Sequence, residues 1–198
     1  MMDTQTKSLW SHILGLAVEG KFKGTELPAI PSDMVTWSAW KREHPETTVL
    51  NLSRSNKNYT KEFYRDPKRF VVGFTGKYGI QHCSFASLID QPLVNVDARG
   101  LPLVISFDPE STSARLFVRR LDGKTLTFES HKNQQIRDKE TGSIWTRAGI
   151  AIQGPLKDKF LEPHVGIVSY RRAWLTFHPD SREVTVPGVK RAAQPASK

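Results

Sequence analysis

A phrase that occurs twice constrains the fold of this chain more than any other feature. Residues 3–11 read DTQTKSLWS and residues 138–146 read DKETGSIWT, and the match continues beyond each phrase with one residue deleted. Such a duplication predicts two equivalent copies of one structural unit, because similar sequences fold alike. The paired residues are Asp3 with Asp138, Thr6 with Thr141, Ser8 with Ser143, Trp10 with Trp145, Gly15 with Gly149, Ala17 with Ala151, Gly20 with Gly154, Leu27 with Leu161, Trp40 with Trp174, His44 with His178 and Pro45 with Pro179.

The repeat is domain-sized, and its first copy begins deep inside the unit. The missing front of that copy should resemble about residues 66–137. We therefore expect either a fragment of a longer protein or a gene that has lost its front part. An incomplete unit predicts uncovered apolar surface, so its partner would be the missing N-terminal portion or another protein that covers it. The expected division is a C-terminal part of a first unit at 1–50, a connector at 51–68, a complete second unit at 69–186 and a disordered basic tail at 187–198.

Local patterns predict a β-rich α+β fold with mostly antiparallel strands and a few short helices. Alternating apolar residues predict hairpins at 69–85, 92–109 and 114–130, the last around Asp122-Gly123, and weak alternation predicts one more strand in 144–155. Helix signals are short and end at a proline. They lie in residues 32–45, with Ser32 or Asp33 as the N-cap, and in residues 169–179.

Composition excludes several classes of protein. No apolar run is long enough for a membrane span, and the start has no secretory signal. The single cysteine, Cys83, permits no intramolecular disulfide or Cys-rich zinc site and is typical of a small buried hydrophobe. The net charge of +9 suits an acidic partner, but the basic residues are scattered. This scatter argues against nucleic-acid binding, which we keep as a second alternative that predicts steep salt dependence.

The repeated motifs resemble domain-of-unknown-function family 3179. The resemblance rests on Asp-x-x-Thr-x-Ser-x-Trp, on Gly-x-Ala-x-x-Gly-Pro-Leu, on RRLDGKTLTFES and on RFVVGFTGKYGIQHCSFASL, and it covers nearly all of residues 2–184. It implies two such halves, no established activity and frequent export, so a fragment of an exported member would be extracytoplasmic. It also implies a Cys-Pro-Leu-Cys-Gly thiol pair in the first half. In this chain Asp108 and Ser111 stand where the second copy would carry those cysteines, which argues against a redox role.

The repeated Asp-x-x-Thr-x-Ser phrase has two interpretations. The oxygen atoms of Asp138, Thr141 and Ser143 could converge on a ligand or cation. Alternatively, the carboxylate caps a turn and the hydroxyls bond the local backbone, which is the interpretation we favour. The repeat-equivalent residues are Asp3, Thr6 and Ser8, and the tryptophans Trp10, Trp40, Trp145 and Trp174 are expected to be structural.

Three further side chains are candidates for ligand binding. His178, like its equivalent His44, precedes a proline and could act as a ligand or acid–base group, although a histidine there more often caps a helix. Asp108 and Glu110 could bind a metal or act as acid and base, but their segment also predicts a turn. The sequence assigns no metal, cofactor or catalytic residue, and leaves open whether the chain is an enzyme. We rank a non-catalytic binding or structural portion first and a metal- or ligand-binding, enzyme-like unit second.

Overall fold

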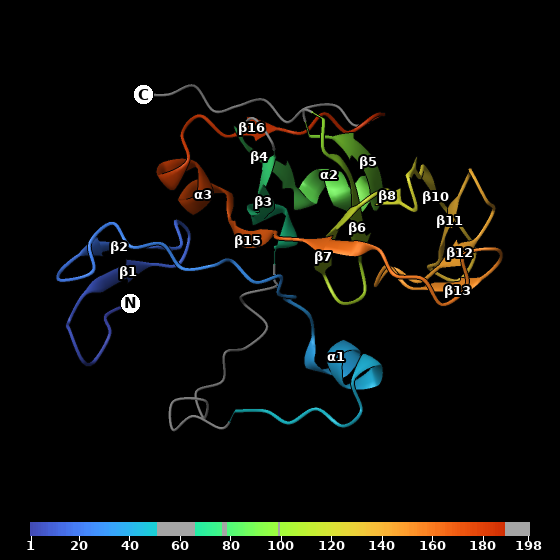
Figure 1. Ribbon diagram of the computed structural model, residues 1–198. Helices are drawn as coiled ribbons and strands as arrows, with labels where there is room; N and C mark the ends of the chain where they lie inside the picture. The colour runs from blue at the N-terminus through green and yellow to red at the C-terminus, as the bar shows by residue number, and fades with distance from the viewer. Residues whose placement is uncertain (51–65, 77–78, 99, 189–198) are drawn as a thin grey trace.

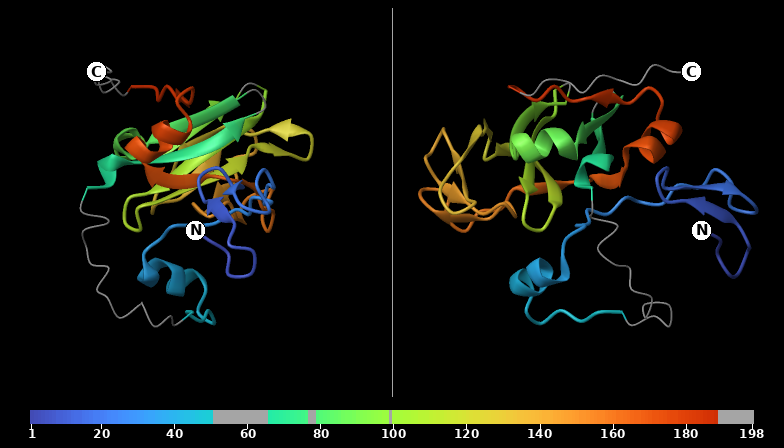
Figure 2. Two further views of the ribbon diagram at one scale, coloured as in Figure 1. Left: turned by 90° about the vertical axis from the view of Figure 1, so that its left-hand side faces the viewer. Right: turned by 180° about the vertical axis from the view of Figure 1, so that it is seen from behind.

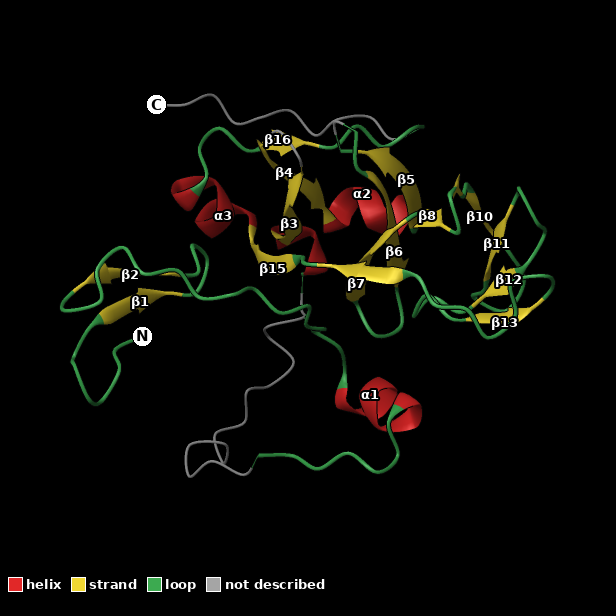
Figure 3. Cartoon of the chain, in the orientation of Figure 1, coloured by secondary structure: helices red, strands yellow, loops and turns green. Residues whose placement is uncertain are grey.

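The computed structural model describes residues 1–50, 66–76, 79–98 and 100–188. Most of the expected connector and nearly all of the expected tail lie outside the described residues. The predicted β-rich, mostly antiparallel fold is confirmed, as Figure 3 shows. The helices are α1 (Trp37–Glu43), α2 (Phe85–Asp90), α3 (Arg171–Phe177) and the 3₁₀ turn η1 (Pro67–Arg69).

Three four-stranded sheets make up the body of the molecule. All their neighbouring strands pair antiparallel except β16 and β4, which are parallel. The first sheet has the order β15 (Ile167–Tyr170), β3 (Phe70–Gly76), β4 (Gly79–Ser84) and β16 (Arg182–Glu183); the second has β14 (Glu162–His164), β7 (Ser113–Val118), β6 (Pro102–Asp108) and β5 (Leu93–Asp97); the third has β10 (Phe128–Ser130), β11 (Ile136–Asp138), β12 (Ile144–Trp145) and β13 (Ala151–Gln153).

The second sheet is buried on both faces. Alternate residues of a strand point to opposite faces, and in β6 Leu103 and Ile105 enter a core shared with the first sheet and α2. Val104, between them, enters a separate core shared with the third sheet. Neighbouring Leu116 and Phe117 of β7 divide in the same way. This double burial explains why β6 is almost continuously apolar rather than alternating.

The predicted hairpins are partly confirmed. Strands β3 and β4 pair, as do β5 and β6, as expected. The hairpin expected over 114–130 is wrong in its extent, because only β8 (Arg120–Leu121) and β9 (Lys124–Thr125) pair there while β7 pairs with β6 and β14. The single strand expected in 144–155 is also wrong. It is two antiparallel strands, β12 and β13, because the chain reverses before Gly149, whose φ is +79°.

The expected N-cap of α1 was wrong. The helix begins after Thr36 rather than after Ser32 or Asp33, and it ends at Glu43, with His44 as its C-cap just before Pro45. Thr36 has extended φ and ψ values of −66° and 145°, close to the −59° and 134° of Tyr170 before α3. The residue before each helix is therefore extended, and the helix begins at the next residue, Trp37 in α1 and Arg171 in α3.

The first copy lies beside the stacked sheets rather than within them. Its hairpin of β1 (Leu9–Ser11) and β2 (Leu16–Glu19) lies on the α3 side of the molecule, and α1 lies apart from the sheets (Figures 1 and 2). Arg115 of β7 ties this region to the body through its Nε, 2.8 Å from Asp33 Oδ2, and its Nη2, 2.8 Å from Glu43 Oε2.

Candidate functional site

The repeated phrase folds into a compact polar turn, which we define as Asp-x-x-[Ser/Thr]-x-Ser with the Asp carboxylate at its centre. In the first copy Asp3 Oδ1 accepts the Thr6 backbone N–H at 2.6 Å. Asp3 Oδ2 accepts the Thr6 hydroxyl at 2.7 Å and the Trp10 indole N–H at 3.2 Å. The Thr6 and Ser8 hydroxyl oxygens are 2.8 Å apart. The carboxylate is therefore surrounded by donors from its own turn.

The second copy repeats this polar turn. Asp138 accepts the Thr141 backbone N–H at 2.6 Å and the Trp145 indole N–H at 2.8 Å. The Thr141 and Ser143 hydroxyl oxygens are 2.7 Å apart. Both turns also close with a 3.1 Å bond from the Asp N–H to the Ser carbonyl. Sequence duplication thus corresponds to duplicated geometry.

Each of these two polar turns is closed by a glycine that approaches its last serine. Ser143 Oγ accepts the Leu156 N–H at 3.0 Å. A β-carbon on Gly154 would lie 2.7 Å from Ser143 Cα, closer than packing allows. A β-carbon on Gly20 would lie equally close to Ser8 Cα. These glycines also have positive φ values of 95° and 89°, so no larger residue fits without strain.

A third polar turn joins β6 to β7. The Ser111 hydroxyl donates to Asp108 Oδ2 at 2.5 Å and lies 3.0 Å from the Ser113 hydroxyl oxygen, while Asp108 Oδ1 accepts the Glu110 N–H at 3.0 Å. The residue before the final serine has a positive φ in all three turns. These residues are Lys7 (58°), Thr112 (56°) and Gly142 (72°).

The described residues bring Asp138, Thr141 and Ser143 together, but they do not bring all the predicted ligand-binding side chains into one site. Asp108 and Glu110 line one cleft, His178 lines another, and Asp138 lines neither. Nor do three His, Cys, Asp or Glu side chains anywhere in the described part of the chain gather closely enough to hold a metal ion. Ligand binding by the polar-turn residues, including Thr141 and Ser143, therefore stays a prediction.

Donors from its own turn also change the acidity of the first carboxylate. The backbone N–H and then the hydroxyl of Thr6, with further help from Trp10, hold the pKa of Asp3 well below its ordinary value of 3.8. The charged form of Asp3 is thus the one that the turn stabilises.

Each copy places a histidine against a tryptophan at the end of its helix. The ring centroids of Trp40 and His44 are 4.0 Å apart, and those of Trp174 and His178 are 4.3 Å apart. Both histidines are C-cap residues whose backbone N–H bonds the tryptophan carbonyl at 2.8 Å. Partial burial lowers the pKa of His178 below 6.5, opposed by the neighbouring backbone of Ile13.

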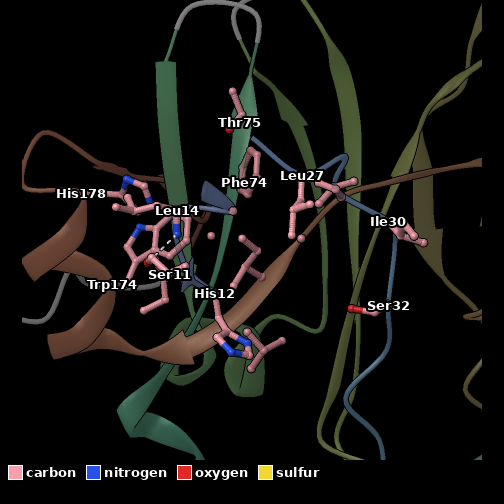
Figure 4. A pocket seen from close by; sticks show the side chains of 18 of the residues that line it. Ser11, His12, Leu14, Leu27, Ile30, Ser32, Phe74, Thr75, Trp174 and His178 are labelled. Carbon is pink, nitrogen blue, oxygen red and sulfur yellow. Dashed lines mark hydrogen bonds between the residues drawn. The ribbon is translucent and has the colours of Figure 1, made fainter. Parts of the chain in front are cut away.

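Among the described residues, two clefts lie where the copies meet. The first cleft, of about 940 Å³, is lined by the loop between β1 and β2, by residues 26–34, by β3, β15 and α3. Figure 4 shows Trp174 and His178 on one side of it and Ile30 on the other, with Leu27 and Phe74 between them.

The second cleft, of about 820 Å³, is lined by the matching loop of the second copy and by α1. It contains Trp40 and His44, together with Arg42, Arg115 and Arg147. Each cleft therefore combines the loop of one copy with the Trp–His pair of the other. The two clefts differ in charge, because no Lys or Arg side chain lines the first.

Some notable contacts had no signal in the sequence. Arg115 pairs with Asp33 and Glu43, which are far away along the chain. His82 is buried, and its Nδ1 lies 2.9 Å from Ser181 Oγ while Nε2 has no partner. Burial lowers the pKa of His82, opposed by Glu183. By contrast, the third polar turn could have been found, because DPESTS has the spacing of DTQTKS.

The described helices are all too short to cross a membrane. Searches of curated proteins and of solved structures gave no significant match. A family model described as "Protein of unknown function (DUF3179)" matches residues 1–69 and again residues 64–181. The two overlapping matches span most of the chain and confirm the resemblance inferred from the repeated motifs. The chain therefore belongs to the DUF3179 family.

Proposed function

We propose that this chain is a non-catalytic binding portion of a two-unit protein, and that its first copy docks against a sheet equivalent to β5–β7. The family resemblance implies that the thiol pair lies in the front part of the first unit. In this proposal that front part supplies both the missing sheet and any redox or metal chemistry. The described residues serve to recognise and hold it.

The difference between Trp10 and Trp145 carries the proposal. Both bond the carboxylate of their polar turn, but Trp145 is fully buried against Val104 and Phe117 of the second sheet, whereas Trp10 is only partly covered. Leu161 is 4% exposed and its equivalent Leu27 is 56% exposed. The first copy thus presents the face that the second copy buries, without a sheet in front of it.

Helix α1 supports the same conclusion. In the second copy Trp174 is buried against Gly73 of β3. Its equivalent Trp40 is only half-buried. Residues 33–36 correspond to β15, which pairs with β3, yet they have no strand partner among the described residues. A strand equivalent to β3 would both cover Trp40 and pair with residues 33–36.

A fusion protein tests the proposal. A second copy of residues 66–137 is placed directly ahead of Asp3, in the way that these residues precede Asp138 in the second unit. Cys83 of the added segment is replaced by Ala. We expect amide hydrogen exchange in β1 and β2 to slow markedly, because docking buries the hairpin. Exchange in the added residues 70–84 reports in the same experiment whether the added segment folds.

The matched control carries Val104→Asp in the added segment only. Val104 belongs to the core that buries Trp145, so a charge there should prevent docking while leaving the original units unchanged. Equal exchange of β1 and β2 in the fusion, the control and the original chain, with the added segment folded, would contradict the proposal.

A further inference from the structure

We propose that the first cleft, between the two copies, binds a small, uncharged and largely apolar molecule. This inference does not depend on the docking of a sheet. The second cleft is lined by residues 146–150, which directly follow Trp145. Trp145 is already buried against the second sheet, so a sheet packed on this tryptophan does not close the cleft. The first cleft would likewise remain open after docking.

The size and walls of the first cleft suit such a ligand. Its volume of about 940 Å³ falls within the range of ~300–1,000 Å³ typical of sites for small molecules. Leu14, Leu27, Ile30, Phe74 and Trp174 supply apolar surface from both copies (Figure 4). A ligand here would contact both copies at once.

The polar groups of the cleft are few and largely neutral. Ser11, His12 and His178 offer hydrogen-bonding atoms among the apolar side chains. The carboxylates of the lining are Glu26 and Asp33, and Asp33 already pairs with Arg115. No Lys or Arg side chain lines the cleft, and the α-ammonium of Met1, which does belong to the lining, donates to the Trp10 carbonyl at 2.9 Å. An anionic ligand would therefore find little counter-charge. The charge pattern therefore favours an uncharged ligand with one or two hydrogen-bonding groups.

One wall of the cleft is fixed by ion pairs. Arg115 fixes residues 33–43 to β7 through Asp33 and Glu43. A preformed cleft of this kind binds a ligand with little loss of conformational entropy.

Titration with Nile red, a neutral apolar dye, tests the inference on the full chain. We expect saturable one-to-one binding with blue-shifted dye emission. Ile30→Glu and His12→Glu should each weaken binding about tenfold or more, because each would place a carboxylate beside the apolar dye. Both side chains are exposed, so the variants should fold, which their melting curves check.

Val18→Glu is the matched control, since Val18 is exposed in β2 and does not line the cleft. It should bind the dye as the original chain does. The anionic dye anilinonaphthalene sulfonate should bind more weakly than Nile red. The inference would be overturned if Nile red showed no saturable binding, or if both cleft variants bound the dye as tightly as the original chain. It would also be overturned if Val18→Glu weakened binding as much as the cleft variants do, or if the anionic dye bound more tightly than Nile red.

Discussion

Trp174 of α3 lies so close to Gly73 of β3 that any side chain on Gly73 would overlap its indole ring. The ring is also held by its indole N–H, which donates to Ser181 Oγ at 2.8 Å. The absence of a side chain at Gly73 is therefore what allows α3 to pack directly on the first sheet.

Gly73→Ala should destabilise the chain by at least about 2 kcal/mol, because the new methyl group must displace a fully packed ring. Denaturant unfolding measures the loss. Trp174→Phe in the same chain should recover part of it, so the two substitutions should be non-additive. Thr75→Ala, at an exposed position of the same strand, is the control and should change stability by less than about 0.5 kcal/mol. Additive effects would disprove the packing argument.

Gly154→Ala should cost more stability than Gly142→Ala. Both glycines have positive φ, at 95° and 72°, so both substitutions introduce backbone strain. Only at Gly154 does the β-carbon also meet the backbone of Ser143, while at Gly142 it meets nothing within 4 Å. We expect a difference of about 1 kcal/mol or more in the free energy of unfolding. Equal losses would show that the close approach has no energetic role.

The first polar turn should open in acid. The pKa of Asp3 is lowered in the folded state, so its stabilisation is fully present above its unfolded pKa of about 3.9 and is lost progressively as the pH falls below that value. The protection factors of the β1 and β2 amides, which correct for the pH dependence of intrinsic exchange, should therefore fall below about pH 4. Asp3→Asn should exchange faster at neutral pH and lose this pH dependence. Asp90→Asn, at an exposed helix end, should retain it.

Arg115→Met should loosen α1 without unfolding the sheets. The substitution removes the hydrogen bonds and ion pairs to Asp33 and Glu43, which are partly exposed, so we expect a local loss of about 1 kcal/mol. Amide exchange in residues 37–43 should accelerate several-fold. Arg137→Met removes an exposed pair with Glu129 elsewhere and should leave α1 unchanged. Faster exchange of α1 in both variants would contradict the assigned role of Arg115.

Much of the local structure followed from sequence because it depends on near neighbours. The polar turn joins residues within a few positions of each other, so Asp138, Thr141 and Trp145 could be matched to Asp3, Thr6 and Trp10 before any coordinates. Antiparallel hairpins such as β3–β4 were predicted for the same reason.

Long-range features could not be predicted in this way. The alternating apolar residues of 113–118 are compatible with pairing to the strand before or to the strand after them in the sequence. In the structure this segment, β7, pairs with β6 and β14 in a sheet that is buried on both faces. The first cleft brings His12 and Ile30 to Trp174, and no local pattern links such distant positions. Its residues were therefore largely absent from the predicted site, apart from His178.

The docking of the first copy is the central claim, and thiol labelling tests it most directly. Native Cys83 is fully buried and burial raises its pKa to about 12, so an introduced cysteine can be followed alone. Leu27→Cys should react quickly with Ellman's reagent in the original chain and at least about tenfold more slowly in the fusion with residues 66–137. Val18→Cys should react equally in both, because Val18 is 41% exposed and its equivalent Ile152 is 40% exposed beside a docked sheet. Equal reactivity of Leu27→Cys in the original chain and the folded fusion would contradict the claim.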